Sequence, residues 1–211
     1  GLIYYRVGTD TTRRLLEGPA SGIRDPKMSA DGMVVTYARR SDPTGPLAGN
    51  PYQVWAISVA TGAEELISVT RGGQAGQGDS RDPQISADGR FIVFRSAAED
   101  LVVGDGNGLA DIFVRDRYTG VTSLLSRTDE GVSGNSVSTR PQISGDGGYA
   151  AFTTFADNLL PGDMNGLEDV VLAVIPREAA PDTDSDGLPD GWERDQFGSL
   201  DPVVGPGFFR I

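Results

Sequence analysis

The sequence contains no cysteine and no histidine. Without cysteine the chain can form no disulfide, no thiolate nucleophile, and no cysteine-ligated zinc or iron–sulfur site. The absence of histidine removes the commonest general base and the usual ligand of transition metals. A Ser-His-Asp triad cannot be built from this chain alone, and we expect no enzymatic activity.

Basic charge and long apolar runs are also scarce. Lys27 is the only lysine, and 18 basic residues face 30 acidic ones, which gives a formal net charge of −12. Because nucleic acids bind basic surfaces, we expect no nucleic-acid partner, whereas an acidic surface suits divalent cations. No apolar run approaches the roughly 18 residues of a spanning helix, so we expect no membrane span. Since the chain begins at Gly1, the lack of a signal peptide says nothing about export.

What the chain does contain is a repeat. The segment RDPKMSADG at 24–32 recurs as RDPQISADG at 81–89 and as TRPQISGDG at 139–147. The prolines of the three copies, Pro26, Pro83 and Pro141, lie 57 and then 58 residues apart. Such a constant offset indicates a tandem structural repeat. The 29 glycines and 13 prolines favour many turns over long helices.

Each copy predicts four antiparallel strands. An Asp-Gly turn separates a short first strand from an alternating or apolar second strand, and this turn is a strong hairpin signal because it needs positive φ. Second strands are expected at 33–38, 91–96 and 149–154, third strands at 53–59, 111–115 and 169–175, and fourth strands at 65–69 and 122–126. Four such strands in about 57 residues make one blade of a β-propeller.

The predicted fold is therefore all-β, with about three four-stranded propeller-type blades in an incomplete ring, followed by a C-terminal calcium loop and a short helix. Strands at 3–7 and 12–16 predict a half blade over 1–18. Blades follow at 19–76 and 77–134, and a partial blade at 135–175 stops after its third strand. The repeat domain thus covers 1–175, and 176–181 is a linker. Residues 182–198 form an EF-hand-like calcium loop, and 199–211 form a tail.

The second copy, PQISADGRFIVFRSAAEDLVVGDGNGLADIFVRDRYTG, resembles TolB-like and related bacterial β-propeller repeats. This resemblance covers roughly residues 1–175 and implies a propeller fold. Relatives of this kind are mostly binding scaffolds, and some precede hydrolase domains. The resemblance therefore implies a blade architecture and says little about function.

A calcium-type loop follows the repeats. Its predicted ligands are Asp182, Asp184, Asp186, Leu188, Asp190 and Glu193. They occupy positions 1, 3, 5, 7, 9 and 12 of the D-x-D-x-D-G-x5-E pattern, with Gly187 at the sharp turn. The carboxylates are the hard oxygen ligands that calcium prefers, position 7 would contribute its backbone carbonyl, and position 9 would bind directly or through water. The alternative interpretation is an acidic, solvated linker.

The segment DTDSDGLPDGWERDQFGSL resembles thrombospondin type 3, dockerin and EF-hand-like calcium repeats of bacterial surface proteins. This resemblance implies a Ca²⁺ cofactor and a location outside the cell or on its surface. The chain departs from the pattern because Pro176 and Pro181 bracket the place of the upstream EF-hand helix, and because the repeat occurs once rather than in tandem. A helix of one or two turns is expected within 188–197, with Gly198 as its stop.

Two shorter loops share the pattern D-x-N-G-x-x-D. Their candidate calcium ligands are Asp105, Asn107 and Asp111 in the second copy and Asp163, Asn165 and Asp169 in the third. Carboxylates and an amide oxygen around a glycine suit calcium, but Asp and Asn also close turns by bonding their own backbone. Both interpretations stay open. The first copy has no acid at 45–51, so a calcium site in every blade is not expected.

An incomplete ring leaves strand edges exposed, and such edges pair with other chains. The apolar tail at 203–211 could supply the missing fourth strand of the third blade, either to its own chain or to a neighbour in a head-to-tail polymer. We therefore expect a non-enzymatic, calcium-binding structural or assembly protein, outside the cell or on its surface, whose partners are copies of itself or a surface protein. One alternative is a partner-binding propeller module of a larger periplasmic or surface protein. Another is a carbohydrate-active enzyme, for which no catalytic carboxylate pair stands out.

Overall fold

In the computed structural model, the described residues are 3–6, 11–14, 22–40, 50–183 and 188–198. This part of the chain holds thirteen strands and one helix. They are β1 (Ile3–Arg6), β2 (Thr11–Arg14), β3 (Arg24–Met28), β4 (Val34–Arg40), β5 (Tyr52–Ser58), β6 (Glu64–Leu66), β7 (Ser80–Ile85), β8 (Phe91–Ser96), β9 (Asp111–Asp116), β10 (Val121–Leu124), β11 (Ser138–Ile143), β12 (Tyr149–Thr154), β13 (Asp169–Val174) and α1 (Asp190–Phe197).

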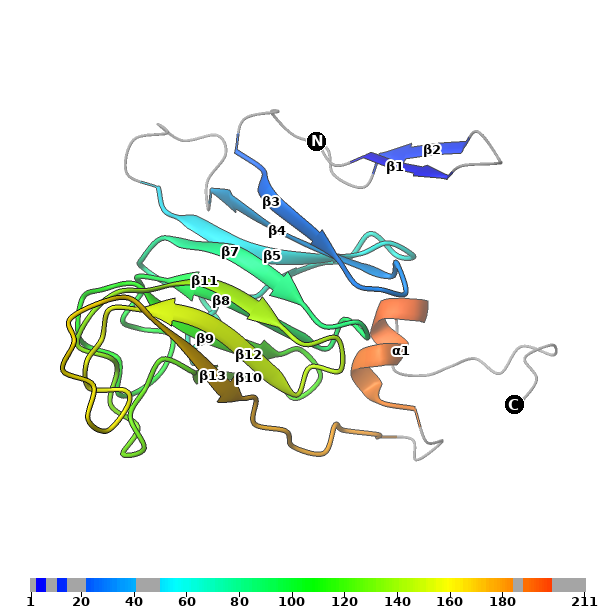
Figure 1. Cartoon of the computed structure of the whole chain (residues 1–211). Coiled ribbons are helices and arrows are strands. Elements are labelled where there is room, and N and C mark those ends of the chain that lie inside the picture. The colour runs from blue at the N-terminus through cyan, green and yellow to red at the C-terminus, as the bar shows by residue number, and fades with distance from the viewer. Residues whose placement is uncertain (1–2, 7–10, 15–21, 41–49, 184–187, 199–211) are drawn as a thin grey trace.

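The strands form antiparallel sheets in which each strand pairs with its sequence neighbours. The sheet orders are β3-β4-β5-β6, β7-β8-β9-β10, β11-β12-β13 and β1-β2. We call the first three sheets blade 1, blade 2 and blade 3, and Figure 1 shows them layered one behind another, with α1 at one end of the strands. Antiparallel four-stranded sheets joined in this order are propeller blades. The predicted fold class, an all-β incomplete ring of blades with a short C-terminal helix, is confirmed.

The same hairpin turn joins the first two strands of every blade. In blade 2, the Ser86 hydroxyl donates to Asp88 Oδ1 at 2.5 Å, and Gly89 adopts a φ of 73°. Blade 3 repeats the bond from Ser144 to Asp146 at 2.6 Å. Asp-Gly is needed here because the aspartate closes the turn and only glycine takes the left-handed position without strain.

The core lies in two seams between neighbouring blades. Seam 1–2 buries Val54 and Ala56 of blade 1 against Ile92 and Phe94 of blade 2, and the Phe94 ring stacks on Phe113 with centroids 5.8 Å apart. Seam 2–3 packs Phe91, Val93, Ile112 and Val114 of blade 2 against Ala150 and Phe152 of blade 3. Blade 2 is therefore apolar on both faces, because each of its faces meets another blade.

The fourth strands are shorter than predicted, because a serine side chain replaces the backbone ladder at their ends. β6 stops at Leu66, and the Val54 amide then donates to the Ser68 hydroxyl at 2.9 Å. β10 stops at Leu124, and the Ile112 amide donates to the Ser126 hydroxyl at 2.9 Å. Both serines are fully buried, so these bonds complete the hydrogen bonding of the seam.

A β-bulge precedes the proline in the first strand of each blade, and the pattern of the sequence did not predict it. Asp25, Asp82 and Arg140 take positive φ values of 52°, 56° and 54°. The register of β3–β4, β7–β8 and β11–β12 shifts at the same places. Aspartate tolerates this left-handed conformation, whereas the longer Arg140 adopts it only because the sheet requires it.

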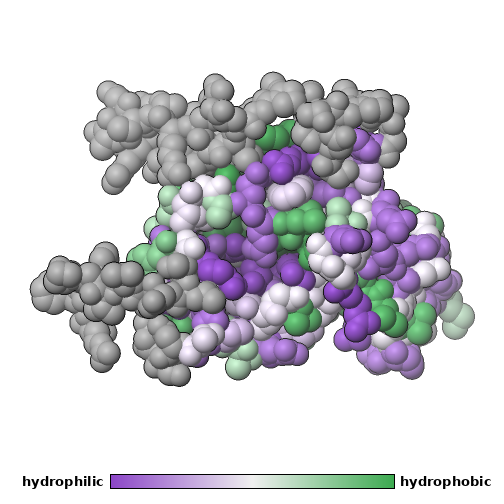
Figure 2. All heavy atoms as spheres, turned by 180° about the vertical axis from the view of Figure 1, so that it is seen from behind, coloured by the Kyte–Doolittle hydropathy of each residue, from purple (hydrophilic) through white to green (hydrophobic). Residues whose placement is uncertain are grey.

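The face of the molecule seen in Figure 2 is mixed, with hydrophilic residues over most of its described surface and hydrophobic patches between them. Such a surface fits the acidic composition. No helix in the described residues is long and apolar enough to cross a membrane.

Candidate calcium sites and the docked C-terminal helix

The D-x-N-G-x-x-D loop of blade 2 leads into β9 and is held by its own side chains. Asp111 is fully buried, and its carboxylate accepts bonds from the Ser126 hydroxyl at 2.6 Å and from Asn107 Nδ2 at 2.7 Å. Asn107 Nδ2 also donates to the Gly134 carbonyl at 2.6 Å, and Asn107 Oδ1 accepts from the Leu109 amide at 2.7 Å. Asn107 and Asp111 therefore bind the loop to the end of blade 2.

In blade 1 a single residue makes the hydrogen bonds that Asn107 and Asp111 make in blade 2. Gln53 stands 58 positions before Asp111, and its Oε1 accepts from the Ser68 hydroxyl at 2.5 Å. Its Nε2 donates to the Gly76 carbonyl at 2.8 Å, and Gly76 is the counterpart of Gly134. A neutral amide thus replaces the Asn107–Asp111 pair in blade 1. This equivalence supports a structural role for that pair, which the sequence interpretation had left open beside calcium.

Asp105 differs from its neighbours in the same loop. Both of its carboxylate oxygens are buried, and neither has a hydrogen-bond partner among the described residues. Burial and, to a smaller extent, the nearby Asp111 carboxylate raise the pKa of Asp105 to about 6, although the backbone N–H groups of Asn107 and Gly106 partly oppose this shift. A buried carboxylate without hydrogen bonds is costly unless a cation compensates it. Asp105 is thus the described residue of this loop that fits a bound cation best.

We predict that Asp105→Asn stabilises the calcium-free protein by about 1–2 kcal/mol at pH 7, because it removes a buried charge while keeping the shape. The folded pKa lies above the unfolded value, so the wild-type stability from this group is present below about pH 4 and is lost as pH rises through about 6. Urea unfolding in EDTA at pH 4.5 and pH 7 measures both effects.

The matched control is Asp163→Asn in blade 3. There the carboxylate accepts the Asn165 amide at 3.2 Å, so its removal should change stability by less than about 0.5 kcal/mol. Destabilisation of Asp105→Asn at pH 7 in EDTA would contradict the prediction.

The corresponding loop of blade 3 has the same turn, but the described residues show no counterpart of the Ser126–Asp111 hydrogen bond that holds the loop of blade 2. Asn165 Oδ1 accepts the Leu167 amide at 2.6 Å, as Asn107 does in blade 2. One oxygen of Asp169, Oδ2, is buried and has no hydrogen-bond partner in the described part of the chain. Blade 3 has no described strand equivalent to β10, and therefore no described serine in the place of Ser126.

The C-terminal calcium-type loop is described only in part, since Asp184 and Asp186 lie outside the described residues. Asp190 begins α1, and its carboxylate accepts the Thr183 amide and the Thr183 hydroxyl, each at 2.7 Å. These hydrogen bonds lower the pKa of Asp190. Glu193 is in the first turn of the same helix and is 0% exposed. The expected short helix is confirmed, and Gly198 ends it in the left-handed conformation with φ 77°.

Helix α1 docks on the turn end of seam 1–2, which the sequence did not predict. The guanidinium of Arg117 donates two hydrogen bonds to the Asp195 carboxylate, from Nη1 at 2.9 Å and from Nη2 at 2.8 Å. Arg117 Nε also donates to Glu65 Oε2 at 2.9 Å, and Nη1 to the Gly89 carbonyl at 2.9 Å. Burial lowers the pKa of Arg117, but the carboxylates of Asp195 and Glu65 more than offset this and raise it. One buried arginine thus joins blade 1, blade 2 and α1.

Close packing also holds α1 against the blades. Gly191 lies against the ring of Tyr118, so close that a Cβ there would stand 2.1 Å from Tyr118 Cδ1. The Ser58 hydroxyl donates to the Asp195 carbonyl at 2.6 Å. A cavity of about 230 Å³ remains between α1 and the turns of seam 1–2. Helix α1 is therefore attached to blades 1 and 2, although it follows blade 3 in the sequence.

Across residues 22–40, 50–183 and 188–198, no three acidic side chains gather closely enough to hold a metal ion. The predicted ligand Leu188 is described, and it is 38% exposed. Calcium binding at the loops of 105–111, 163–169 and 182–193 therefore stays a prediction.

No family model matches the sequence, and no curated protein matches it. Among solved structures, TolB from Acinetobacter baumannii is 17% identical over 81% of this chain, with a TM-score of 0.45. A putative TolB from Agrobacterium tumefaciens is 15% identical over 79%, with a TM-score of 0.46, and the tricorn protease is 16% identical over 79%, with a TM-score of 0.49.

This chain spans 36% of the first of these proteins, 62% of the second and 14% of the third. At these identities and TM-scores the similarities carry no inference about activity or partners. The fold rests on the strand order of the blades.

Proposed function

We propose that this chain is a non-enzymatic, calcium-stabilised structural module that assembles with copies of itself outside the cell. The observation that carries the proposal is an open blade face. In blade 2, Ile112 and Val114 face blade 3, which covers them to 0% and 3% exposure. Their counterparts 58 residues later, Val170 and Leu172, are 73% and 69% exposed.

We call this surface the forward face and define it by Tyr149, Val170, Leu172 and Val174. All four are large apolar side chains, and each is about half exposed or more. The opposite side of β13 packs Val171 and Ala173 into seam 2–3. Blade 3 is thus built like a blade with neighbours on both sides, and a contiguous apolar face of this kind marks an interaction surface.

A second copy is the partner that we propose for this face. Blades 1 and 2 already show that a blade of this repeat accepts the next one on these positions. At the other end, β1 and β2 pair only with each other in the described part of the chain, and make half the strands of a complete blade. An open face at one end and an incomplete blade at the other favour head-to-tail contact. The tail predicted as a donor strand, residues 199–211, lies outside the described residues.

Calcium would stabilise two loops of this module, the loop before β9 in blade 2 and the loop before α1. In the loop of blade 2 the residue that would hold it is Asp105, and in the C-terminal loop the described buried carboxylates at ligand positions are Asp190 and Glu193. A bound cation would compensate these charges and fix the loop before α1. Extracellular modules bind calcium at about 10⁻⁴–10⁻³ M, a range that fits a location outside the cell.

Light scattering after size exclusion, in calcium buffer, tests the proposal. We expect the mass that light scattering gives for the wild-type chain to exceed the monomer mass of 22.2 kDa. Leu172→Lys should return it to the monomer, because an unpaired charge on the forward face is costly to desolvate against another blade. The control Val132→Lys changes a 56% exposed valine outside that face and should leave the assembly intact.

EDTA should weaken the assembly, because it removes the calcium proposed to stabilise the loop of blade 2 and the loop before α1. A wild-type chain that is monomeric at all concentrations, with and without EDTA, would overturn the proposal.

A further inference from the structure

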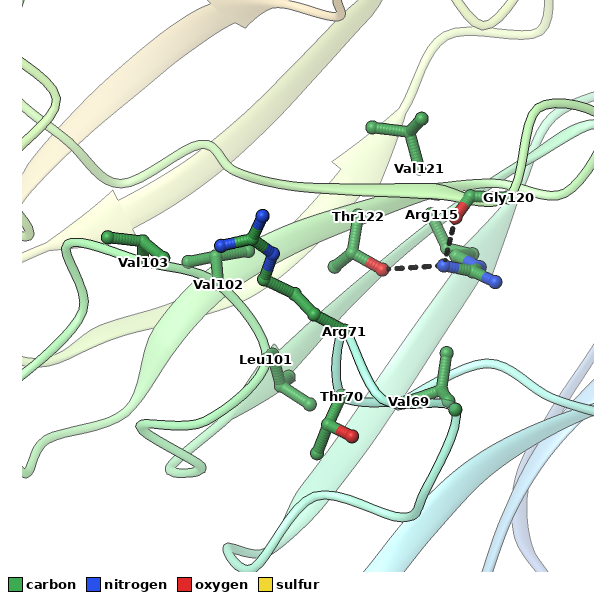
Figure 3. A pocket seen from close by; sticks show the side chains of 11 residues that line it. Val69, Thr70, Arg71, Leu101, Val102, Val103, Arg115, Gly120, Val121 and Thr122 are labelled. Carbon is green, nitrogen blue, oxygen red and sulfur yellow. Dashed lines mark hydrogen bonds between the residues drawn. The ribbon is translucent and has the colours of Figure 1, made fainter.

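A second site lies in a cleft of about 460 Å³ beside the outer strand of blade 2. Its walls come from the turn after β6, from the loop before β9 and from the β9–β10 hairpin, as Figure 3 shows. The apolar part of the lining includes Leu101, Val102, Val103 and Val121. Small-ligand sites typically measure about 300–1,000 Å³ and combine apolar walls with a few polar groups.

Two arginines provide the charged groups of this cleft. Arg115 Nη1 donates to the Gly120 carbonyl at 2.6 Å and to the Thr122 hydroxyl at 3.0 Å, whereas its Nε is buried without a hydrogen-bond partner. Burial lowers the pKa of Arg115. Arg71 is exposed and reaches over the cleft beside Val102 in Figure 3. Neither arginine forms an ion pair with a described residue.

The repeat shows that the fold does not require these arginines. The turn that carries Arg71 recurs in blade 2, where Thr128 bonds Val132 as Thr70 bonds Gln74, but the residue in the place of Arg71 is Asp129. The counterparts of Arg115 are Ile57 in blade 1 and Ala173 in blade 3. Seam 1–2 thus carries an arginine where the other blades have apolar residues. The two hydrogen bonds of Arg115 and the nearby Glu65 and Asp116 carboxylates compensate this buried charge only in part, and a ligand carboxylate would add to that compensation.

We propose that this cleft binds an extended peptide in which acidic side chains alternate with apolar ones. Arginine matches carboxylates through paired N–H donors, and a positive cleft on a chain of net charge −12 attracts acidic ligands to this place. The described partner of β10 is β9 alone, so β10 is an edge strand that can accept another strand. Acidic side chains two residues apart would share the side facing the arginines, and apolar ones would reach the valines.

Fluorescence anisotropy with two labelled pentapeptides tests this site. The probe is Val-Glu-Val-Glu-Val, and the matched control is the neutral Val-Gln-Val-Gln-Val. We expect the wild-type chain to bind the glutamate peptide at least tenfold more tightly. Arg71→Asp and Arg115→Ile install the residues of the other blades, which the fold already accepts, and each should reduce this preference to less than threefold. Arg127→Gln, an exposed arginine outside the cleft, should leave it unchanged.

Equal binding of the two peptides, or no binding of either, would overturn the proposal. A glutamate preference that survives both cleft variants would place the binding elsewhere and overturn it as well. Thermal unfolding of each variant shows whether the blades remain folded, and Arg71→Asp, at an exposed position, keeps the test valid if Arg115→Ile does not fold.

Discussion

Arg117→Met is expected to cost about 3–5 kcal/mol of folding free energy, the largest effect of any single change considered. The substitution removes the guanidinium that pairs with Asp195 and leaves that carboxylate, only 6% exposed, without its cation. It also removes the hydrogen bond to the Gly89 carbonyl. Urea unfolding gives the free energy, and amide hydrogen exchange of α1 should show the helix released from the blades.

A double variant separates the charge from the packing. Arg117→Met with Asp195→Leu removes both charges, and it should recover most of the loss because an apolar pair of similar volume replaces a buried ion pair at little cost. Arg95→Met is the exposed control, since the Arg95–Asp82 pair has the same 2.9 Å distance but side chains 30% and 42% exposed. It should cost less than about 1 kcal/mol. Equal losses of folding free energy in Arg117→Met and Arg95→Met would contradict the view that the buried Arg117–Asp195 pair holds α1 to the blades.

Gly191→Ala should detach α1 without unfolding the blades. The new Cβ would meet the Tyr118 ring at 2.1–2.9 Å, which forces the helix or the ring to move, at a cost of about 1–3 kcal/mol. Alanine favours an isolated helix, so any loss of protection in α1 must come from the dock and not from helix propensity.

Hydrogen exchange of residues 190–197 measures this effect, and we expect it to be at least tenfold faster than in the wild type. Gly72→Ala is the control, because its Cβ would make only an ordinary 3.7 Å contact with Thr70. Unchanged protection of α1 in Gly191→Ala would show that the helix does not rest on Tyr118.

The strands of the blades were predictable because local patterns determine them. Asp-Gly turns and alternating apolar residues located β8 and β12 at their observed bounds, and the constant offset identified the blade. The fourth strands were predicted too long, because Ser68 and Ser126 end the ladder with side-chain bonds. A serine in a polar strand gives no sign of that role.

The docked helix could not be predicted from local patterns, because Arg117 and Asp195 are 78 residues apart. Comparing the repeats position by position supplies a signal that was missed. The counterparts of Arg117 are Val59 and Ile175, so a charged residue stands where the other blades are apolar. The same comparison singles out Arg115, and it separates residues that every blade needs from those that serve one seam.

The candidate calcium residues show the limit of motif spacing. The spacing of Asp105, Asn107 and Asp111 suggested three equal ligands. Their contacts differ, because Asn107 and Asp111 bond each other and the blade, whereas Asp105 does not share those bonds. Burial and hydrogen bonding decide between turn and ligand, and neither is visible in the order of residues.

Thiol labelling of a single cysteine on the forward face tests the central claim most directly. The chain has no cysteine, so Leu172→Cys introduces one reporter in a small apolar side chain. In calcium buffer at high protein concentration, we expect Leu172→Cys to react at least tenfold more slowly than Val132→Cys, and to lose this protection on dilution. Equal labelling rates of the two variants at every concentration would contradict the account, because the forward face would then be open to solvent.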